Sequence, residues 1–172
     1  MKNLNVYMDS LGFITSNGQP LFSINPSSRP KVSLVQLTGV PPTVRNFDEA
    51  LAVLRMFVTA ALSNPRVRPV LNRLDLIADD DICLLFRMQA PNESTLKRVR
   101  ALSDAGIRVR VIAHDRSNLY GSGYRCEGGL TDKGKTLIEW MAMSGLIPDV
   151  SGCNHQTTFE VLEHLRHEAL PL

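Results

Sequence analysis

The stretch ICLLFRMQAPNESTLKRVRALSDAGIRVRVIAHD, residues 82–115, decides the fold. It opens with a short continuous apolar run, Ile82 to Phe86, which is typical of a strand covered on both faces. A helix follows, with Ser94 as its predicted cap, Gly106 as its stop and apolar residues at helical spacing between them. Ile107 to Ala113 is then a second strand. This order of strand, helix and strand predicts a right-handed βαβ unit and a parallel sheet.

The same alternation continues downstream. A glycine-rich loop covers residues 117–129, and a helix is predicted from Leu130 to Ser144. Leu146 to Val150 is the next predicted strand, and Asn154 to Glu168 is the last predicted helix. The apolar residues of this last helix that we expect to face inward are Phe159, Leu162 and Leu165.

Upstream of residue 82 the pattern predicts two strands, Leu4 to Asp9 and Lys31 to Val40. A helix is predicted from Asn46 to Leu62, with Asn46 as its cap. Val67 to Ile77 favours a second short helix. An Asn-Gly pair between apolar-rich runs predicts a β-hairpin appendage over residues 11–24.

Composition limits the function classes. The 172 residues suit one domain, residues 1–172, and 44% hydrophobic with 21% charged residues is ordinary for a soluble globular protein. A net charge of +2 favours neither nucleic acid nor an anionic membrane as a partner. No segment has the run of about 18 to 20 apolar residues that a membrane span needs. We therefore expect a cytoplasmic protein.

Functional residues of parallel α/β folds gather where strands end. His114 directly follows an apolar strand and is flanked by Asp115 and Arg116. A histidine there can bind an anion or act as a general acid or base. The alternative is a structural histidine that bonds a neighbouring loop carbonyl.

A second candidate combines Cys153 and His155 near the start of the last helix. One interpretation is a thiol with a lowered pKa. The other, which we favour, is an ordinary helix start capped by Asn154. The sequence contains no HExxH, GxSxG or Walker pattern that would indicate a particular catalytic chemistry.

Three segments resemble the membrane (renal) dipeptidase family of zinc-dependent peptidases: GIRVRVIAHDRSN (106–118), GGLTDKGKTLIEWMAMSGLIPDVS (128–151) and TTFEVLEHL (157–165). The middle segment is distinctive, because a Gly-Gly-Leu-Thr loop leads into a helix with an early Gly134 and then a strand ending Asp-Val-Ser. The resemblance implies a (β/α)8 barrel with two zinc ions at its C-terminal mouth that hydrolyses dipeptides.

The family's metal positions are altered in this sequence. Where the family's first strand ends in His-x-Asp, the first ligand is replaced by Tyr7 and the second is kept as Asp9. Gln89 is the nearest counterpart of the bridging glutamate, and Gly152 stands where Asp-x-Ser-His has its histidine. The family's substrate-contacting histidine is kept as His114.

These replacements argue against a dinuclear zinc site. An amide has no charge with which to bridge two cations, and tyrosine, with a free pKa near 10, is a rare substitute for imidazole. Without zinc, the water nucleophile is not activated. We therefore expect no bound metal, no cofactor and no dipeptidase activity in a single chain.

The expected fold is α/β, a partial or open TIM-barrel-like parallel sheet of about five strands with surrounding helices. The leading hypothesis is a catalytically inactive dipeptidase-like protein that binds a small ligand through His114, Arg116 and Asp9. One alternative is a hydrolase with a rebuilt or intersubunit site that uses Asp9, His114, Cys153 and His155. Another is a structural or regulatory partner of a full-length homologue. Because open sheet edges need cover, we expect a homo-oligomer, most simply a dimer.

Overall fold

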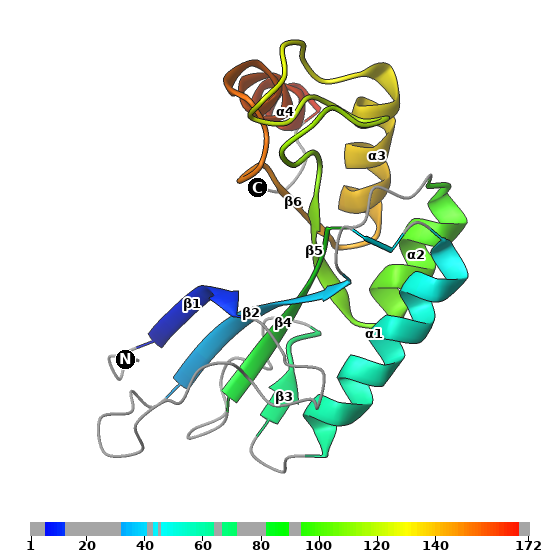
Figure 1. The fold of residues 1–172 in the computed structure, drawn as a ribbon, viewed down its shortest axis with the longest axis vertical. Coiled ribbons are helices and arrows are strands. Elements are labelled where there is room, and N and C mark those ends of the chain that lie inside the picture. The colour runs from blue at the N-terminus through cyan, green and yellow to red at the C-terminus, as the bar shows by residue number, and fades with distance from the viewer. Residues whose placement is uncertain are drawn as a thin grey trace.

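The computed structural model describes residues 6–12, 32–40, 43–44, 46–63, 67–71, 82–89 and 94–168. Figure 1 shows a twisted sheet with helices α1 and α2 side by side along it, and with α3 and α4 beyond its C-terminal strands. The four helices are α1 (Phe47–Leu62), α2 (Leu96–Asp104), α3 (Asp132–Met143) and α4 (His155–His167). Within these ranges no helix is both long enough and apolar enough to cross a lipid bilayer.

The described strands form one sheet in which every pair is parallel. The strands are β1 (Val6–Gly12), β2 (Val32–Val40), β3 (Val67–Pro69), β4 (Ile82–Met88), β5 (Ile107–Val111) and β6 (Ile147–Asp149). Their order is β1-β2-β4-β5-β6, and β3 pairs with the N-terminal half of β4. The sheet is therefore a partial barrel, as expected, with the short β3 added to the five strands that the sequence indicates.

The strand β3 corrects one prediction. A helix was expected from Val67 to Ile77, but residues 67–69 form a strand, and the segment from residue 72 lies outside the described residues. The residue before a proline is biased toward extended backbone, so Arg68 before Pro69 favours a strand, and a short strand at the rim of a sheet tolerates the proline. The predicted hairpin over residues 11–24 can be followed only at Leu11 and Gly12, which belong to β1; the remainder lies outside the described ranges.

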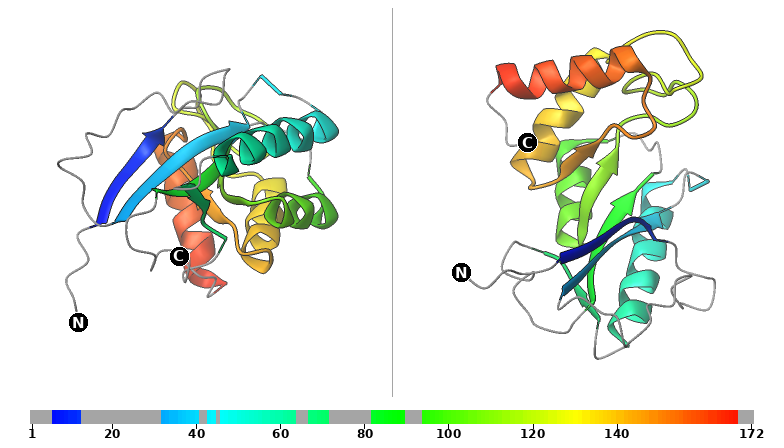
Figure 2. Two further views of the ribbon diagram at one scale, coloured as in Figure 1. Left: turned by 90° about the horizontal axis from the view of Figure 1, so that it is seen from below. Right: turned by 90° about the vertical axis from the view of Figure 1, so that its left-hand side faces the viewer.

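The core lies between the sheet and the helices (Figure 2). Alternate residues of β4 point toward the helices, and Leu84, Phe86 and Met88 are buried there. Helices α1 and α2 contribute Leu54 and Leu102 to the same cluster. The intervening residues of β4 point to the other face of the sheet, because side chains alternate along a strand.

The helix starts follow capping chemistry. The side chain of Asn46 accepts a hydrogen bond from the backbone N–H of Asp48 at 2.7 Å, as predicted for α1. The cap of α2 is Thr95, whose hydroxyl accepts from the N–H of Arg98 at 3.3 Å. The prediction of Ser94 as this cap was wrong by one residue, because a hydroxyl stands at both positions.

The last helix is turned differently from the prediction. Phe159 and Leu162 were expected inside, but they are 58% and 49% exposed. The buried residues of α4 are Thr157, Val161 and Leu165, spaced four apart along one face. Thr157 can face inward because its hydroxyl accepts a hydrogen bond from the backbone N–H of Ser122 in the loop after β5. A polar residue therefore occupies a place that periodicity gives to an apolar one.

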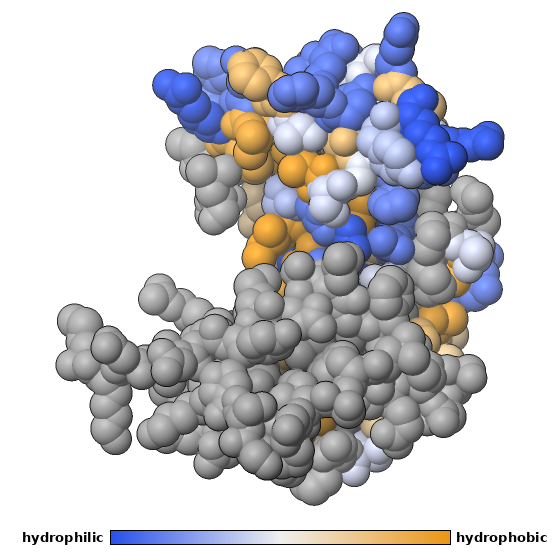
Figure 3. Space-filling view, turned by 60° about the vertical axis from the view of Figure 1, so that its left-hand side comes forward, coloured by the Kyte–Doolittle hydropathy of each residue, from blue (hydrophilic) through white to orange (hydrophobic). Residues whose placement is uncertain are grey.

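Large apolar side chains are also exposed elsewhere in the C-terminal part. Ile147 on β6 is 52% exposed. Figure 3 shows apolar surface lying among polar surface in the upper part of the molecule.

Pro148 faces the outer side of β6. The carbonyl of Asp149 accepts from the N–H of Ile112 at 3.0 Å, so Asp149 directs its backbone groups toward β5. Successive residues of a parallel strand direct these groups to opposite sides. The ring nitrogen of Pro148, which carries no hydrogen, therefore faces away from β5.

Candidate functional site

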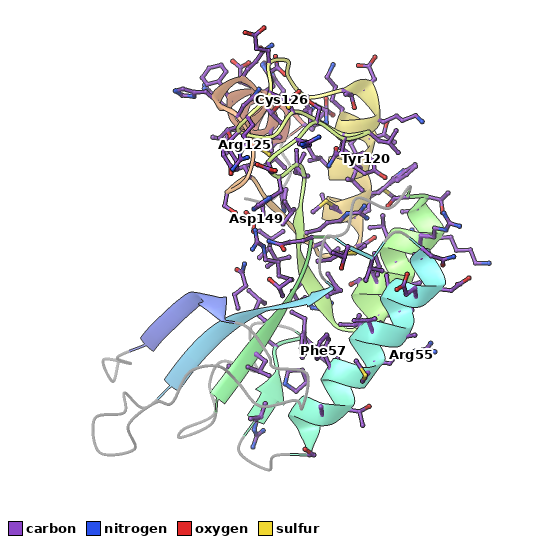
Figure 4. The ribbon with its side chains drawn as sticks, in the orientation of Figure 1. Arg55, Phe57, Tyr120, Arg125, Cys126 and Asp149 are labelled. Atoms are coloured by element: carbon purple, nitrogen blue, oxygen red, sulfur yellow. The ribbon has the colours of Figure 1, made fainter. Side chains whose placement is uncertain are left out.

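The loop that follows β5 and the turn that follows β6 pack against each other. The backbone N–H of Tyr124 donates to the carbonyl of Gly152 at 3.1 Å, and the N–H of Asn154 donates to Ser122 at 3.0 Å. Figure 4 shows the side chains of this region, with Asp149 at the end of β6. The two segments form one structural unit at the C-terminal ends of neighbouring strands, where the sequence predicts the functional residues to lie.

His114 sits on a strained turn. The N–H of Arg116 donates to the carbonyl of His114 at 2.5 Å, and Asp115 between them has a φ of 55°. A hydrogen bond from residue i+2 back to residue i around a positive φ is a γ-turn, an uncommon and strained backbone conformation. Such strain persists only where the surroundings determine the conformation.

Asp115 is held from two directions. Its carbonyl accepts from the backbone N–H of Arg125 at 3.0 Å, and its carboxylate Oδ1 lies 2.7 Å from the Nε of the same arginine. The Arg125 guanidinium also stacks over the ring of Tyr124, 5.3 Å from the ring centre. The hydrogen bond to the Tyr124 hydroxyl and the charge of the Asp115 carboxylate raise the pKa of Arg125, so this side chain stays charged.

Two glycines allow the turn to pack this closely. A Cβ at Gly123 would lie 2.6 Å from the carbonyl carbon of Asp115 and 2.7 Å from the nitrogen of Arg116. A Cβ at Gly152 would lie 2.6 Å from Cδ2 of His114 and 2.9 Å from the carbonyl oxygen of Ala113. Neither position has room for a side chain, so the turn that carries His114 is packed between the two glycines.

The side chains of His114 and Arg116 are both exposed. The His114 ring makes an edge-to-face contact with Tyr124, with ring centres 6.3 Å apart and an angle of 86° between the planes. Among the described residues, neither His114 nor Arg116 has a hydrogen-bond or ion-pair partner for its side chain. This observation does not support the alternative of a structural histidine bonded to a loop carbonyl. The turn therefore presents an imidazole and a guanidinium that are available to a ligand.

Sequence reasoning missed Arg87, which lies at the C-terminal end of β4 with a side chain only 4% exposed. Its Nε lies 2.6 Å from Oδ2 of Asp149, and its Nη2 donates to the hydroxyl of Ser151 at 3.0 Å. The other carboxylate oxygen of Asp149 accepts from the N–H of Ser151 at 2.8 Å. An arginine directly after an apolar strand core is the signal that could have identified this buried charge.

A second buried arginine lies on the opposite face of the sheet. Arg110 of β5 donates to the hydroxyl of Ser94 at 2.7 Å and lies over the ring of Tyr120. Burial lowers the pKa of Arg110, and the charge and hydrogen bond of Tyr120 partly oppose that shift. Arg110 thus joins the sheet to the start of α2.

Among the described residues, no hydrogen bond joins Cys153 to His155. The Cys153 thiol donates weakly to the carbonyl of Ala113 at 3.6 Å. Burial raises the pKa of this thiol, and the nearby charge of Asp149 raises it further, so the interpretation of an activated thiol was wrong. Asn154 instead caps α4 by accepting from the N–H of Thr157 at 2.8 Å, which is the alternative that the sequence favours.

The residues that the structure describes do not fit a dinuclear zinc site. Within the described ranges, no three His, Cys, Asp or Glu side chains converge to hold a metal ion. Tyr7 and Asp9 belong to β1 (Figure 1). Gln89 directly follows β4 and offers only an amide. A ligand side chain at Gly152 would collide with His114.

A shallow cleft of about 330 Å³ lies elsewhere, between α3 and α4. It contains no residue of the His114 turn or of the strand ends. The cleft is lined by Leu130, Lys135, Glu160, Glu163, His164 and His167.

Comparison with known proteins agrees with this fold. No protein-family model matches the sequence, and no curated protein sequence matches it either. An amidohydrolase from Pseudomonas aeruginosa superposes with a TM-score of 0.71 at 17% identity, over 92% of this chain and 50% of the other. A probable dipeptidase from the same organism gives 0.65 at 14% identity, over 92% and 49%.

A third structure is a metallopeptidase from Rhodobacter sphaeroides that holds a phosphinate mimic of the dipeptide L-Ala-D-Ala. It superposes with a TM-score of 0.57 at 17% identity, over 73% of this chain and 41% of the other. This chain spans about half the length, or less, of each of these proteins. The resemblance to dipeptidases that the three segments suggest is therefore confirmed at the level of the fold: this chain has a partial-barrel fold similar to about half of the fold of an amidohydrolase and of metallodipeptidases.

Proposed function

We propose that this protein binds a small carboxylate-bearing molecule at the turn formed by His114 and Arg116, and that it does not hydrolyse peptides with zinc. The observation that carries the proposal is that the side chains of His114 and Arg116 are both exposed on one strained, tightly packed turn. A guanidinium and an imidazole together offer N–H donors that suit a carboxylate. A turn that is already rigid loses little entropy when a ligand binds.

The same turn supports a binding role over a hydrolytic one. The carboxylate of Asp149 is already paired with Arg87, and Gly152 brings no donor atom. Dipeptide hydrolysis in this fold class would need a metal to lower the pKa of the attacking water. The described residues offer a way to hold an anion but not a way to hold that metal.

Titration with L-Ala-D-Ala and with its C-terminal amide, followed by NMR, tests the proposal. The free dipeptide should shift the resonances of His114, and the amide, which lacks the carboxylate, should not. His114→Ala and Arg116→Ala should each weaken binding by about tenfold, which corresponds to loss of one charge-assisted contact. The control is His167→Ala, because His167 is an exposed residue at the end of α4 outside the turn.

Two outcomes would overturn the proposal. Equal binding of the dipeptide and the amide would show that the carboxylate is not recognised. Stoichiometric zinc in the purified protein, with hydrolysis of L-Ala-D-Ala that depends on it, would restore the enzymatic hypothesis. Purified protein without zinc and without turnover would be consistent with the binding role.

A further inference from the structure

Arg87 makes a contact that spans a whole strand. In the sheet, Arg87 lies beside Val109 of β5, while Asp149 of β6 lies beside Val111. The guanidinium therefore reaches diagonally across β5 to bind the end of β6. The contact ties together the ends of two strands that are not neighbours in the sheet.

The three residues Arg87, Asp149 and Ser151 form a closed cycle of contacts. Arg87 binds Oδ2 of Asp149 and the hydroxyl of Ser151, while Oδ1 of Asp149 binds the N–H of Ser151. The Arg87 side chain is 4% exposed and that of Asp149 is 13% exposed, so water screens the pair weakly. A carboxylate that is largely shielded from water is stabilised by a neighbouring cation, and Arg87 supplies it here.

The cycle of contacts among Arg87, Asp149 and Ser151 also reaches the candidate site. Ser151 precedes Gly152, and Gly152 packs directly against the ring and backbone of His114. The contacts that hold Ser151 in place therefore also hold Gly152, against which His114 packs. Arg87 is thus linked to His114 by successive contacts through Ser151 and Gly152.

We infer that Arg87 is a positioning residue, which holds Asp149 and Ser151 and thereby positions His114 through the turn after β6. The inference concerns the protein without ligand. Its failure can therefore be distinguished from failure of the proposed carboxylate binding.

The competing explanation is that Arg87 is a structural ion pair with no influence on His114. Arg110 provides the matched control, because it is equally buried on the neighbouring strand but faces the helices. If both arginines only stabilise the fold, replacing either one should lower the melting temperature and leave the His114 environment unchanged. If Arg87 positions the turn, only its replacement should change that environment.

The experiment compares Arg87→Ala with Arg110→Ala in the full chain without ligand. NMR resonances of the His114 ring and of the Gly152 amide report the site, and thermal melts report stability. Arg87→Ala should shift both sets of resonances, and Arg110→Ala should shift neither. Millimolar guanidinium, well below denaturing concentrations, should restore the wild-type resonances of Arg87→Ala, whereas urea, its neutral isostere, should not.

The outcomes separate the two explanations. Unchanged His114 and Gly152 resonances in Arg87→Ala, or equal restoration by urea and guanidinium, would overturn the inference. If Arg87→Ala does not fold, Arg87→Lys is measured instead. Lysine keeps the charge but cannot form both contacts of the guanidinium fork, so it should still shift the Gly152 amide. Wild-type resonances in Arg87→Lys would also overturn the inference.

Discussion

Replacing Gly152 with alanine should force His114 off its present position. The new Cβ would lie 2.6 Å from Cδ2 of the His114 ring and 2.9 Å from both the His114 Cα and the Ala113 carbonyl oxygen. Carbon atoms in ordinary contact are about 3.5 to 4.0 Å apart, so the ring has to move by about 1 Å and the backbone must also give. Overpacking of this kind costs about 1 to 3 kcal/mol of unfolding free energy.

A double-mutant cycle isolates the part of this cost that belongs to the ring. In a His114→Ala background the contact with Cδ2 no longer exists, while the contacts with the two backbone atoms remain. The penalty of Gly152→Ala should therefore fall by about 1 kcal/mol but not disappear.

Urea denaturation followed by the fluorescence of Trp140, the single tryptophan, gives the four free energies. Gly145→Ala is the control, because a Cβ there meets nothing within 4 Å and the cost comes only from its φ of +69°, about 1 to 2 kcal/mol. It should leave the NMR resonances of His114 unchanged. The same loss of unfolding free energy for Gly152→Ala in the wild-type and His114→Ala backgrounds would refute the reasoning.

Three further outcomes are expected. Cys153 should react slowly with iodoacetamide at pH 7 and faster only above the usual range of a thiol, because burial and the charge of Asp149 raise its pKa; mass spectrometry gives the rate, and fast labelling at pH 7 would contradict this. Glu160→Gln should lower stability at pH 7 by about 1 kcal/mol or less, because hydrogen bonds from Gln156 and from the N–H of Leu130 lower the pKa of the carboxylate. That stabilisation is present above the unfolded pKa of about 4.3 and is lost as the pH falls through the lower folded value, so melts of both proteins should converge in acid. Sedimentation equilibrium at micromolar concentration should show a dimer that forms at the open side of the partial barrel, and a monomer of 19.1 kDa would reject that association.

Local chemistry was enough to predict most elements of the second half of the chain. The helices from Leu96 onward begin after a hydroxyl or amide cap, and α2 and α3 are followed by Gly106 and Gly145, both with positive φ. Where prediction failed, the deciding interaction was tertiary. Thr157 displaced Phe159 from the inward face of α4 because a loop N–H from elsewhere in the chain satisfies the threonine hydroxyl.

The candidate site was predictable to a similar degree. The position of His114 follows from the strand that precedes it, and its exposure agrees with a binding role. The partnership of Arg87 with Asp149 could not be predicted, because the two residues are 62 positions apart and a strand lies between them. The close packing at Gly152 was equally hidden, since the sequence shows a glycine but not the His114 ring that packs against it.

The orientation of Pro148 has a consequence for aggregation. A strand laid along the outer side of β6, from this chain or another, would find no N–H at Pro148 and would miss a hydrogen bond in the middle of a three-residue ladder. Templated growth of cross-β fibrils depends on an unbroken ladder of such bonds. Pro148 thus acts as a gatekeeper residue, and replacing it with valine should increase thioflavin-positive aggregates of partly unfolded protein.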